Sequence, residues 1–452
     1  MIIMNLSRAA NSLGATFQGK NVDFKGCSTD SRTLAQNELF IAIKGIHFDG
    51  HDFLKSAMER GAAAAMVERD CPSELPLLKV ADTKHAMGKL AGLWRSEFDI
   101  PLIAITGSNG KTTVKEMLVS ILRRVAPVLA TRGNLNNDIG VPLTLFGLGD
   151  EHAYAVIEMG ANHPGEIAWL SNMARPTIAL ITQCAPAHLE GFGSVDGVAH
   201  AKAEIYEGID EHGCAIINAD DDYAEFWQSK ISNIRQLRFG INKPADVFAQ
   251  SIQQSTVTGQ SSFILQTPAG ATSITLPLPG LHNVMNALAA ATCALALDFD
   301  LEIIKQGLEE IRPVKGRLEI KMGLNNSRII DDTYNANPAS LNAALDVLNH
   351  FNGQHWLVLG DMGELGINEE EMHRQAGIAA RDSGVSKLFA TGSLSCYAVD
   401  KFGDGGEYFT SIDELIERLQ TTISHNVTVL VKGSRAMHME QVVFKLMGNS
   451  QC

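Results

Sequence analysis

The amino-acid sequence predicts an α/β protein divided into three domains. The chain has 452 residues, and a single hydrophobic core rarely extends through a chain of this length. Short apolar runs alternate with longer segments that can form helices, as in parallel sheets whose strands are buried on both faces. The character of this alternation changes twice along the chain. We therefore expect domains at residues 1–82, 83–312 and 313–452.

The first stretch mixes short strands and turns. The run Phe-Ile-Ala-Ile at residues 40–43 predicts a strand, because it is apolar and bounded by polar residues. Residues 53–68 predict a helix that leads into an alanine-rich strand. These elements indicate a small α/β domain.

The second stretch carries the clearest alternation. Strands are predicted at four short apolar runs, at residues 102–106, 155–159, 178–182 and 215–218. After the first run, apolar residues recur every three or four positions over residues 114–125, which predicts an amphipathic helix. A strand, a loop and a helix in this order are typical of a parallel sheet.

The third stretch repeats the pattern on a smaller scale. Strands are predicted at residues 328–330, 356–359, 388–390 and 427–431. An intervening helix is predicted around residues 341–348. We expect a second, smaller α/β domain here.

Composition excludes several classes of protein. Lysine and arginine total 37 and aspartate and glutamate 51, a formal charge of -14. This balance argues against nucleic-acid binding and against binding to anionic membranes. The seven cysteines include no CxxC pair, so reduced thiols are expected. We find no signal peptide, and the longest apolar run, residues 287–297, is shorter than the roughly 18 residues that span a bilayer. We therefore expect a cytoplasmic protein without stable membrane insertion.

The strongest local signal is Ile105-Thr-Gly-Ser-Asn-Gly-Lys-Thr-Thr113, between a predicted strand and a predicted helix. Glycines let backbone amides approach phosphates, and a helix N-terminus favours anions. Lys111 can reach the terminal phosphates, and the Thr112 hydroxyl can ligate Mg²⁺. Ile105 stands where the usual motif has glycine, so the loop is a variant. The alternative is a glycine turn that happens to precede a helix. We expect ATP to bind at Gly107, Ser108, Asn109, Gly110, Lys111, Thr112 and Thr113.

Three further residues are candidates for chemistry. Glu158 ends a predicted strand, where ligands bind in open α/β sheets, and could complete a Mg²⁺ shell with Thr112; taken alone, it could be a solvated strand-end acid. His188 follows another strand, although a lone histidine is often a simple loop residue. Lys202, taken alone, could be a surface lysine paired with a neighbouring acid.

These residues belong to a series of motifs that share one order along the chain. They are Thr106–Thr113, Glu158-Met-Gly160, His188, Ala201-Lys-Ala-Glu204 and Gly280-Leu-His-Asn-Val-Met-Asn286. Together they resemble the Mur ligases, which form amide bonds in peptidoglycan precursor synthesis. The resemblance covers nearly the whole chain and implies a UDP-binding domain, a central P-loop ATPase domain and a Rossmann-like C-terminal domain.

Motifs at both ends extend the resemblance. Those near the start, which resemble the UDP-binding domain of the family, are Ser28-Thr-Asp-Ser-Arg32, Leu39-Phe-Ile-Ala42 and Phe48-Asp-Gly-His51. Those in the last third are Gly316-Arg317, Asp331-Asp-Thr-Tyr-Asn-Ala-Asn-Pro338, Leu359-Gly-Asp-Met-Gly-Glu-Leu-Gly366 and Lys432-Gly-Ser-Arg435. The latter resemble the branch that adds D-alanyl-D-alanine to UDP-N-acetylmuramoyl-tripeptide. The Asp-Asn-Pro-Arg motif of the branch that adds the third residue is not found in the sequence.

The resemblance implies roles for individual residues. Lys111 and the loop amides would hold the β- and γ-phosphates of ATP. Thr112 and Glu158 would bind one Mg²⁺, and His188 a second. Lys202 would be carbamylated by CO₂ and become an anion near the second metal. Lys111, Lys202 and His188 are thus the expected catalytic residues.

The remaining roles concern binding. Asn283 and Asn286 would face adenine. Arg317 would contact phosphate, and Asp332 the ribose. For the UDP portion we expect Ser31, Arg32, Lys44 and His51. Near the incoming dipeptide we expect Tyr334, Asn335 and Asn337.

Two other functions remain open from the sequence. One is a different ligase of the same fold, such as a folylpolyglutamate synthase, against which the motifs at 28–51 and 332–338 argue. The other is a nucleotide-binding switch that hydrolyses ATP slowly. The sequence leaves the third residue of the peptide undetermined. We expect a monomer.

Overall fold

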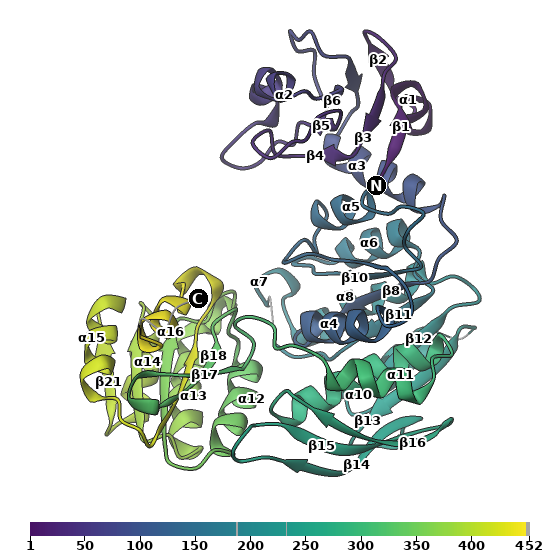
Figure 1. Ribbon diagram of the computed structural model, residues 1–452. Coiled ribbons are helices and arrows are strands. Elements are labelled where there is room, and N and C mark those ends of the chain that lie inside the picture. Colours follow the sequence, from purple (N-terminus) through teal and green to yellow (C-terminus); the bar gives the residue numbers. More distant parts are fainter. Residues whose placement is uncertain (187–188, 232, 449–452) are drawn as a thin grey trace.

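The computed structural model describes residues 1–186, 189–231 and 233–448. Its chain forms the predicted α/β fold, with a small N-terminal part, a central part and a C-terminal part (Figure 1). The N-terminal part, in purple, and the C-terminal part, in yellow-green, lie against different sides of the central part. Within the described residues, no helix has the length and apolar character needed to cross a membrane.

The N-terminal part contains two sheets. β1 (Ile3–Asn5) pairs antiparallel with β3 (Asp23–Lys25). A five-stranded sheet has the order β2-β7-β6-β5-β4 and is parallel except for the pair β2 and β7. Its strands are β2 (Thr16–Gln18), β4 (Cys27–Ser28), β5 (Leu39–Ile41), β6 (Ala64–Val67) and β7 (Leu77–Lys79). Helices α1 (Leu6–Leu13) and α2 (Leu54–Glu59) complete this part, so the predicted strand at 40–43 and the predicted helix-to-strand segment are confirmed.

The central part is built on a nine-stranded sheet in the order β16-β15-β14-β13-β12-β11-β8-β10-β9. The predicted strands are confirmed as β8 (Leu102–Thr106), β10 (Tyr154–Glu158), β11 (Ile178–Ile181) and β12 (Cys214–Asn218). The other strands are β9 (Val128–Ala130), β13 (Arg235–Gly240), β14 (Val247–Gln254), β15 (Ser261–Thr267) and β16 (Gly270–Leu276). Strands β8 to β14 run parallel.

Strands β15 and β16 extend this sheet, with β15 antiparallel to β14 and β16 antiparallel to β15. We did not predict strands β13 to β16 from the sequence. Buried residues alternate with half-buried or exposed ones along much of β14 and β15. Such alternation is typical of a sheet that faces water on one side, and it lacks the continuous apolar runs of the parallel strands.

Helices cover both faces of the central sheet (Figure 1). On one face lie α4 (Lys111–Leu122), α10 (Leu281–Ala296) and α11 (Leu301–Glu309). On the other lie α3 (Thr83–Arg95), α5 (Gly140–Leu145) and α6 (Glu166–Ala174). The apolar core beneath α3, α5 and α6 continues into the N-terminal part. Ile2, Leu6 and Phe24 pack in the same apolar cluster as Leu90 and Leu145.

The C-terminal part has a six-stranded sheet in the order β17-β18-β22-β19-β20-β21, parallel except for β17. The strands are β17 (Glu319–Met322), β18 (Arg328–Asp332), β19 (Gln354–Gly360), β20 (Lys387–Thr391), β21 (Gly406–Phe409) and β22 (Val427–Lys432). One face carries α12 (Pro338–Asn349), α13 (Glu369–Asp382) and α14 (Ser395–Phe402), and the other α15 (Ile412–Thr422) and α16 (Glu440–Leu446). The strands and the helix predicted for this part are confirmed, and α12 faces the central part (Figure 1).

Candidate functional site

The loop between β8 and α4 has the backbone of a phosphate-binding loop. Gly107 and Gly110 have φ angles of 149° and 86°, which favour glycine. A Cβ atom on Gly107 would lie 1.8 Å from the Thr182 hydroxyl oxygen. The first helical residue of α4 is Lys111, so the backbone amides of the loop lie at the N-terminus of this helix. The glycine spacing therefore shapes an anion-binding cradle that any side chain would fill.

Lys111 folds back over this loop. Its Nζ donates a hydrogen bond to the Gly107 carbonyl oxygen at 2.6 Å. Burial lowers the pKa of Lys111, the Glu158 carboxylate opposes this shift, and Arg317 adds to it. The charges of all three side chains are thus coupled in one site, although Arg317 comes from the C-terminal part.

Glu158 lies at the end of β10 beside the loop. Thr112 Oγ1 donates to one carboxylate oxygen of Glu158 at 3.0 Å, and Asn136 Nδ2 donates to the other at 2.8 Å. Glu158 is only 3% exposed, so a solvated strand-end acid is wrong. The structure brings Thr112 and Glu158 together as an oxygen-rich pair of the kind Mg²⁺ prefers. The contribution of Asn136 was missed, because no local motif marks it.

Lys202 lies near the end of α8 (Val195–Ala203), close enough to Lys111 for the two charges to interact. It is 6% exposed, so the alternative of a surface lysine is wrong. Burial and then the positive charge of Lys111 lower the pKa of Lys202 to about 7, against an opposing effect of Cys184. An amine with this pKa is available in its neutral form near pH 7. His188, the remaining predicted catalytic residue, lies outside the described residues.

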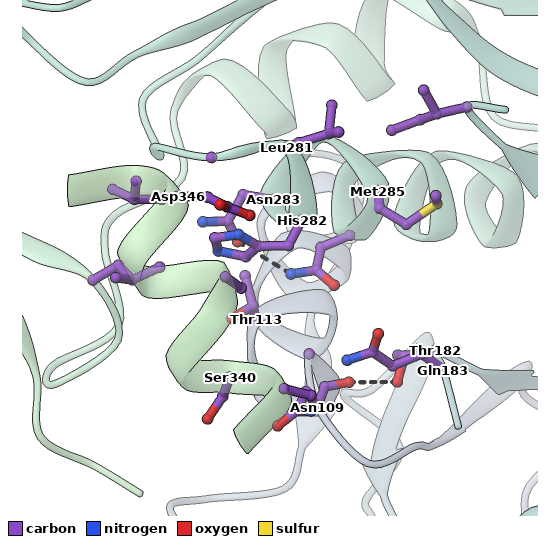
Figure 2. A pocket seen from close by; sticks show the side chains of 18 of the residues that line it. Asn109, Thr113, Thr182, Gln183, Leu281, His282, Asn283, Met285, Ser340 and Asp346 are labelled. Carbon is purple, nitrogen blue, oxygen red and sulfur yellow. Dashed lines mark hydrogen bonds between the residues drawn. The ribbon is translucent and has the colours of Figure 1, made fainter. Parts of the chain in front are cut away.

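A cavity of about 770 Å³ separates the central and C-terminal parts. Figure 2 shows Asn109 and Thr113 of the loop on one side and His282, Asn283 and α12 around the rest. Arg317 and Asp332 also line this cavity. Its size is within the range of small-molecule and cofactor sites. The structure therefore brings the predicted adenine, phosphate and ribose residues to one cleft.

Two asparagines of α10 lie next to the phosphate loop. Asn286 Nδ2 donates to Asn283 Oδ1 at 3.1 Å, and Asn283 Nδ2 donates to the Pro279 carbonyl oxygen at 2.7 Å. A Cβ atom on Gly110 would lie 2.5 Å from Asn286 Oδ1. These contacts fix the orientation of both amides before a ligand arrives.

Two buried donors at the cleft fit an anionic ligand. Arg317 stacks its guanidinium 4.1 Å from the ring centroid of Tyr334. Among the described residues, neither Arg317 Nε nor Asn109 Nδ2 has a hydrogen-bond partner, although both atoms are buried. Buried donors are rarely left unpaired. Phosphate oxygens in the cradle would supply the missing acceptors, so the residues present fit ATP with Mg²⁺.

Asp332 has a second partner that we did not foresee. Its carboxylate forms a buried ion pair with Lys432, whose Nζ also donates to the Asn335 carbonyl oxygen at 3.0 Å. Burial lowers the pKa of Lys432, and Asp332 opposes that shift. The sequence held a signal, since Lys432 ends a mostly apolar strand. Asp332 therefore joins two strands of the C-terminal sheet besides lining the cleft.

We expect Asp332→Ala to destabilise the C-terminal part. The substitution leaves Lys432 as an unpaired buried charge, which costs about 3–5 kcal/mol. Urea unfolding should show this loss, and the double variant Asp332→Ala/Lys432→Met should recover most of it. Nucleotide affinity is then measured in the stable double variant. Unchanged stability of Asp332→Ala would contradict the importance of the ion pair, and normal ATP affinity of the double variant would remove Asp332 from the nucleotide site.

The residues predicted for the dipeptide lie close to the nucleotide cleft. Tyr334 supports Arg317, and the Asn335 carbonyl binds Lys432. Asn337 Nδ2 donates to Asn109 Oδ1 of the phosphate loop at 2.9 Å. The structure thus gives each of the three a contact with the nucleotide-binding machinery.

The four residues predicted for UDP lie in the N-terminal part and do not line the cleft. Ser31 is buried, and Arg32 is exposed in an ion pair with Asp30 at 2.8 Å. Lys44 is exposed and forms a β-bridge with Asp49. His51 is buried, with Nδ1 2.6 Å from Asp49 and Nε2 accepting the Glu68 N–H at 2.9 Å. Both ring nitrogens of His51 therefore have hydrogen-bond partners within the protein.

The sequence analysis missed other lining residues. His282 lies at the start of α10, and burial lowers its pKa to about 4, so the ring is neutral near pH 7. Asp220 accepts backbone N–H groups from Ile241, Asn242 and Lys243 and so holds the loop that borders the cleft. The motif at 280–286 contained His282, whereas Asp220 follows the predicted strand at residues 215–218 and no motif marks it.

The fold and the site define an ATP-dependent enzyme, with a phosphate-binding loop on one domain and the wall of the nucleotide cleft on another. Family models match most of the chain: Mur ligase family, catalytic domain, at residues 23–95; Mur ligase middle domain at 105–294; and Mur ligase, glutamate ligase domain, at 316–435. The chain belongs to the Mur ligase family, and it is an ATP-dependent ligase that uses Mg²⁺.

Individual relatives match over all or nearly all of their lengths. The UDP-N-acetylmuramoyl-tripeptide–D-alanyl-D-alanine ligases of Escherichia coli (strain K12) and Haemophilus influenzae are 44% and 42% identical, each over 100% of both chains. Crystal structure I of MurF from Acinetobacter baumannii is 39% identical over 99% of both chains, with a TM-score of 0.94. The MurF ligase of Thermotoga maritima in complex with ADP is 26% identical over 94% of this chain and 97% of that chain, with a TM-score of 0.84.

Proposed function

We propose that this chain joins D-alanyl-D-alanine to UDP-N-acetylmuramoyl-tripeptide in peptidoglycan precursor synthesis. The observation that carries the proposal is the meeting of Lys111, the Thr112–Glu158 pair and buried Lys202 at one edge of the central sheet. Full-length identity of 44% to a ligase of this name supports the choice of substrates. We further propose that the enzyme acts in the cytoplasm, where ATP is available, and that it acts as a monomer.

The reaction requires activation of a carboxylate. An amine does not displace carboxylate oxygen at useful rates, so the γ-phosphoryl group of ATP is first transferred to the terminal carboxylate of the tripeptide. This transfer forms an acyl phosphate and releases ADP. The neutral amine of D-alanyl-D-alanine then attacks the carbonyl carbon, the C–O bond to phosphate breaks, and the amine loses a proton. The products are the amide, ADP and phosphate.

The residues of the chain serve the first step by offsetting negative charge. Lys111 and the loop amides would hold the β- and γ-phosphates, and Arg317 would approach them from the C-terminal part. Thr112 and Glu158 would hold Mg²⁺, which supplies positive charge to the phosphate oxygens. Positively charged groups fixed before the reaction stabilise charge that develops during phosphoryl transfer.

Lys202 would act as a carbamate. Its neutral amine would attack CO₂, a C–N bond would form, and the released proton would pass to solvent. The product is an anion at a position where burial and Lys111 disfavour the ammonium. The carbamate would add a ligand for the second metal, for which we propose His188.

The proposed substrates divide among the three parts. Ser31, Arg32, Lys44 and His51 remain proposals for the UDP portion, and His51 would act by shaping the site, since its ring nitrogens are engaged. Asn283 and Asn286 would face adenine. We place the dipeptide near Tyr334, Asn335 and Asn337. An acyl phosphate hydrolyses if water reaches it, so the facing central and C-terminal parts would shield it.

ATP hydrolysis should be fully coupled to formation of the amide. We expect phosphate release only when ATP, UDP-N-acetylmuramoyl-tripeptide and D-alanyl-D-alanine are all present, because the amine consumes the acyl phosphate. Phosphate assay and mass spectrometry of the UDP product provide the measurement. A slow nucleotide-binding switch would instead hydrolyse ATP alone and yield no amide, and that result would refute the proposed function.

A further inference from the structure

Asn337 caps a helix in one domain and contacts the phosphate loop of another. Its Oδ1 accepts the backbone N–H of Ser340 at 2.8 Å, and Ser340 Oγ accepts the Asn337 N–H at 3.0 Å. This capping box begins α12 of the C-terminal part. The Asn337 Nδ2 group donates to Asn109 Oδ1 at 2.9 Å, across 228 residues of sequence. One side chain therefore joins the start of a helix to the loop that holds phosphate.

The helix cap determines how both amides are turned. A backbone N–H can only donate, so the Asn337 atom that faces Ser340 is its oxygen. The Asn337 nitrogen then faces Asn109 and requires an oxygen there. The nitrogen of Asn109 is left on the other side, buried and without a partner among the described residues. The orientation of a loop amide is thus set by a helix of the opposite domain.

Asn109 is also held from the central part. The backbone carbonyl oxygen of Asn109 accepts a hydrogen bond from Thr182 Oγ1 at 2.6 Å. Figure 2 shows this hydrogen bond near Ser340 of α12. The backbone of Asn109 is therefore fixed within its own domain. Its side chain receives its orientation from the C-terminal part.

We propose that Asn337 is a positioning residue, an interdomain latch that orients the Asn109 side chain in the phosphate loop only when the C-terminal part is docked. The inference rests on the proposed function, because it takes the loop to hold the phosphates that react. Separation of the two parts removes the Asn337 donor and leaves the Asn109 carboxamide free to rotate. Docking of the C-terminal part therefore also orients Asn109 and completes the phosphate site.

Docking does not depend on this hydrogen bond alone. Helix α7 (Leu189–Phe192) contacts the short helix η4 (Gly366–Asn368), and a Cβ atom on Gly366 would lie 3.6 Å from the Glu190 nitrogen. Loss of the latch therefore leaves other contacts between the parts. We expect its effect on the loop and on the rate rather than on folding.

The latch and the helix cap can be separated by substitution. Asn337→Asp and the neutral Asn337→Ser still cap α12, but the first lacks a donor and the second is too short to reach Asn109. We expect either to lower kcat by about tenfold or more, as loss of a fixed donor does in other enzymes, with a nearly unchanged melting temperature. A role of Asn337 in dipeptide binding alone would instead raise KM for D-alanyl-D-alanine with kcat preserved, and that outcome would overturn the latch.

A matched control removes a cap without a latch. Ser411 caps α15 of the same C-terminal part by accepting the Glu414 N–H at 3.2 Å. Ser411→Ala should lower the melting temperature and leave kcat unchanged. Asn337→Ala should lower both. A loss of kcat in Ser411→Ala equal to that in Asn337→Ala would attribute the effect to stability and overturn the proposal.

A double-variant cycle tests whether Asn337 acts through Asn109. In an Asn109→Ala background, Asn337→Ser should have no further effect on kcat, whereas additive losses would overturn the latch. Hydrogen exchange of residues 105–113 with the ATP analogue AMP-PNP gives a readout without turnover. We expect faster exchange in Asn337→Ser than in the unmodified chain, and equal protection would overturn the latch even if amide synthesis itself had failed.

Discussion

Replacement of Glu158 by alanine should reduce kcat/KM at least about a hundredfold at ordinary Mg²⁺ concentrations, as loss of a metal ligand or its close support does in other enzymes. One carboxylate oxygen of Glu158 accepts a hydrogen bond from Thr112 of the phosphate loop, and the other accepts one from Asn136. Removal of the carboxylate removes the negative charge that would hold the cation. Steady-state rates over a Mg²⁺ titration provide the measurement.

Glu158→Gln separates charge from packing. Glutamine keeps an acceptor and the shape of the side chain, so the free energy of unfolding should change by no more than about 1–3 kcal/mol, the cost of an imperfectly satisfied buried group. The kcat/KM of Glu158→Gln should nevertheless fall about as far as that of Glu158→Ala. Higher Mg²⁺ should restore part of this activity. Glu151→Gln is the control, because Glu151 is exposed on the same domain. Near-normal turnover of Glu158→Gln at low Mg²⁺ would remove Glu158 from the metal site.

The phosphate loop could be predicted because its signal is local. Two glycines, a lysine and threonines follow a buried strand and precede an amphipathic helix, all within residues 102–125. Each feature has its own physical cause, and all of them agree. The parallel strands were predictable for the same reason, since burial on both faces leaves a continuous apolar run.

Contacts between distant residues could not be predicted in this way. The partners Lys432 and Asp332 are separated by 100 residues, and Asn337 and Asn109 by 228. No periodicity encodes such pairs, because they depend on how two sheets and two domains meet. The resemblance to a family marked Asp332 and Asn337 as functional residues, but it did not give the partners that the structure supplies.

Lys202 shows how packing overrides a local pattern. Helix α8 carries the polar residues Asp196, His200 and Lys202 among small and apolar ones, and its sequence is compatible with an exposed lysine. In the structure, Phe192, Val198 and Ala201 form an apolar cluster beside it, and the side chain is buried. Burial changes the chemistry available to the amine, since an exposed lysine has a pKa of about 10.4.

Lys202→Ala should fold normally and lose at least about a hundredfold in kcat, the scale seen when one fixed charge-stabilising group is removed from an active site. A surface lysine would cost at most about 1 kcal/mol of stability and leave the reaction intact. Acetate should restore part of the lost activity, because its carboxylate can occupy the position of the missing carbamate. Lys202→Arg should not respond, since guanidinium keeps its charge and fills the space. Lys230→Ala, on the exposed end of α9 (Ala224–Lys230), is the control and should retain activity.

The pH dependence gives a second test of the carbamate. With the pKa of Lys202 lowered to about 7, the ammonium predominates below pH 7 and the neutral amine above it. At a fixed concentration of dissolved CO₂, reactivation of CO₂-depleted enzyme should therefore rise from pH 6 to pH 8. Acetate-rescued Lys202→Ala should lose the CO₂ dependence, because it has no amine to carbamylate. It should also lose the pH dependence, because acetate is ionised throughout that range. Full activity of Lys202→Ala without acetate would refute the carbamate, as would reactivation that is independent of both CO₂ and pH.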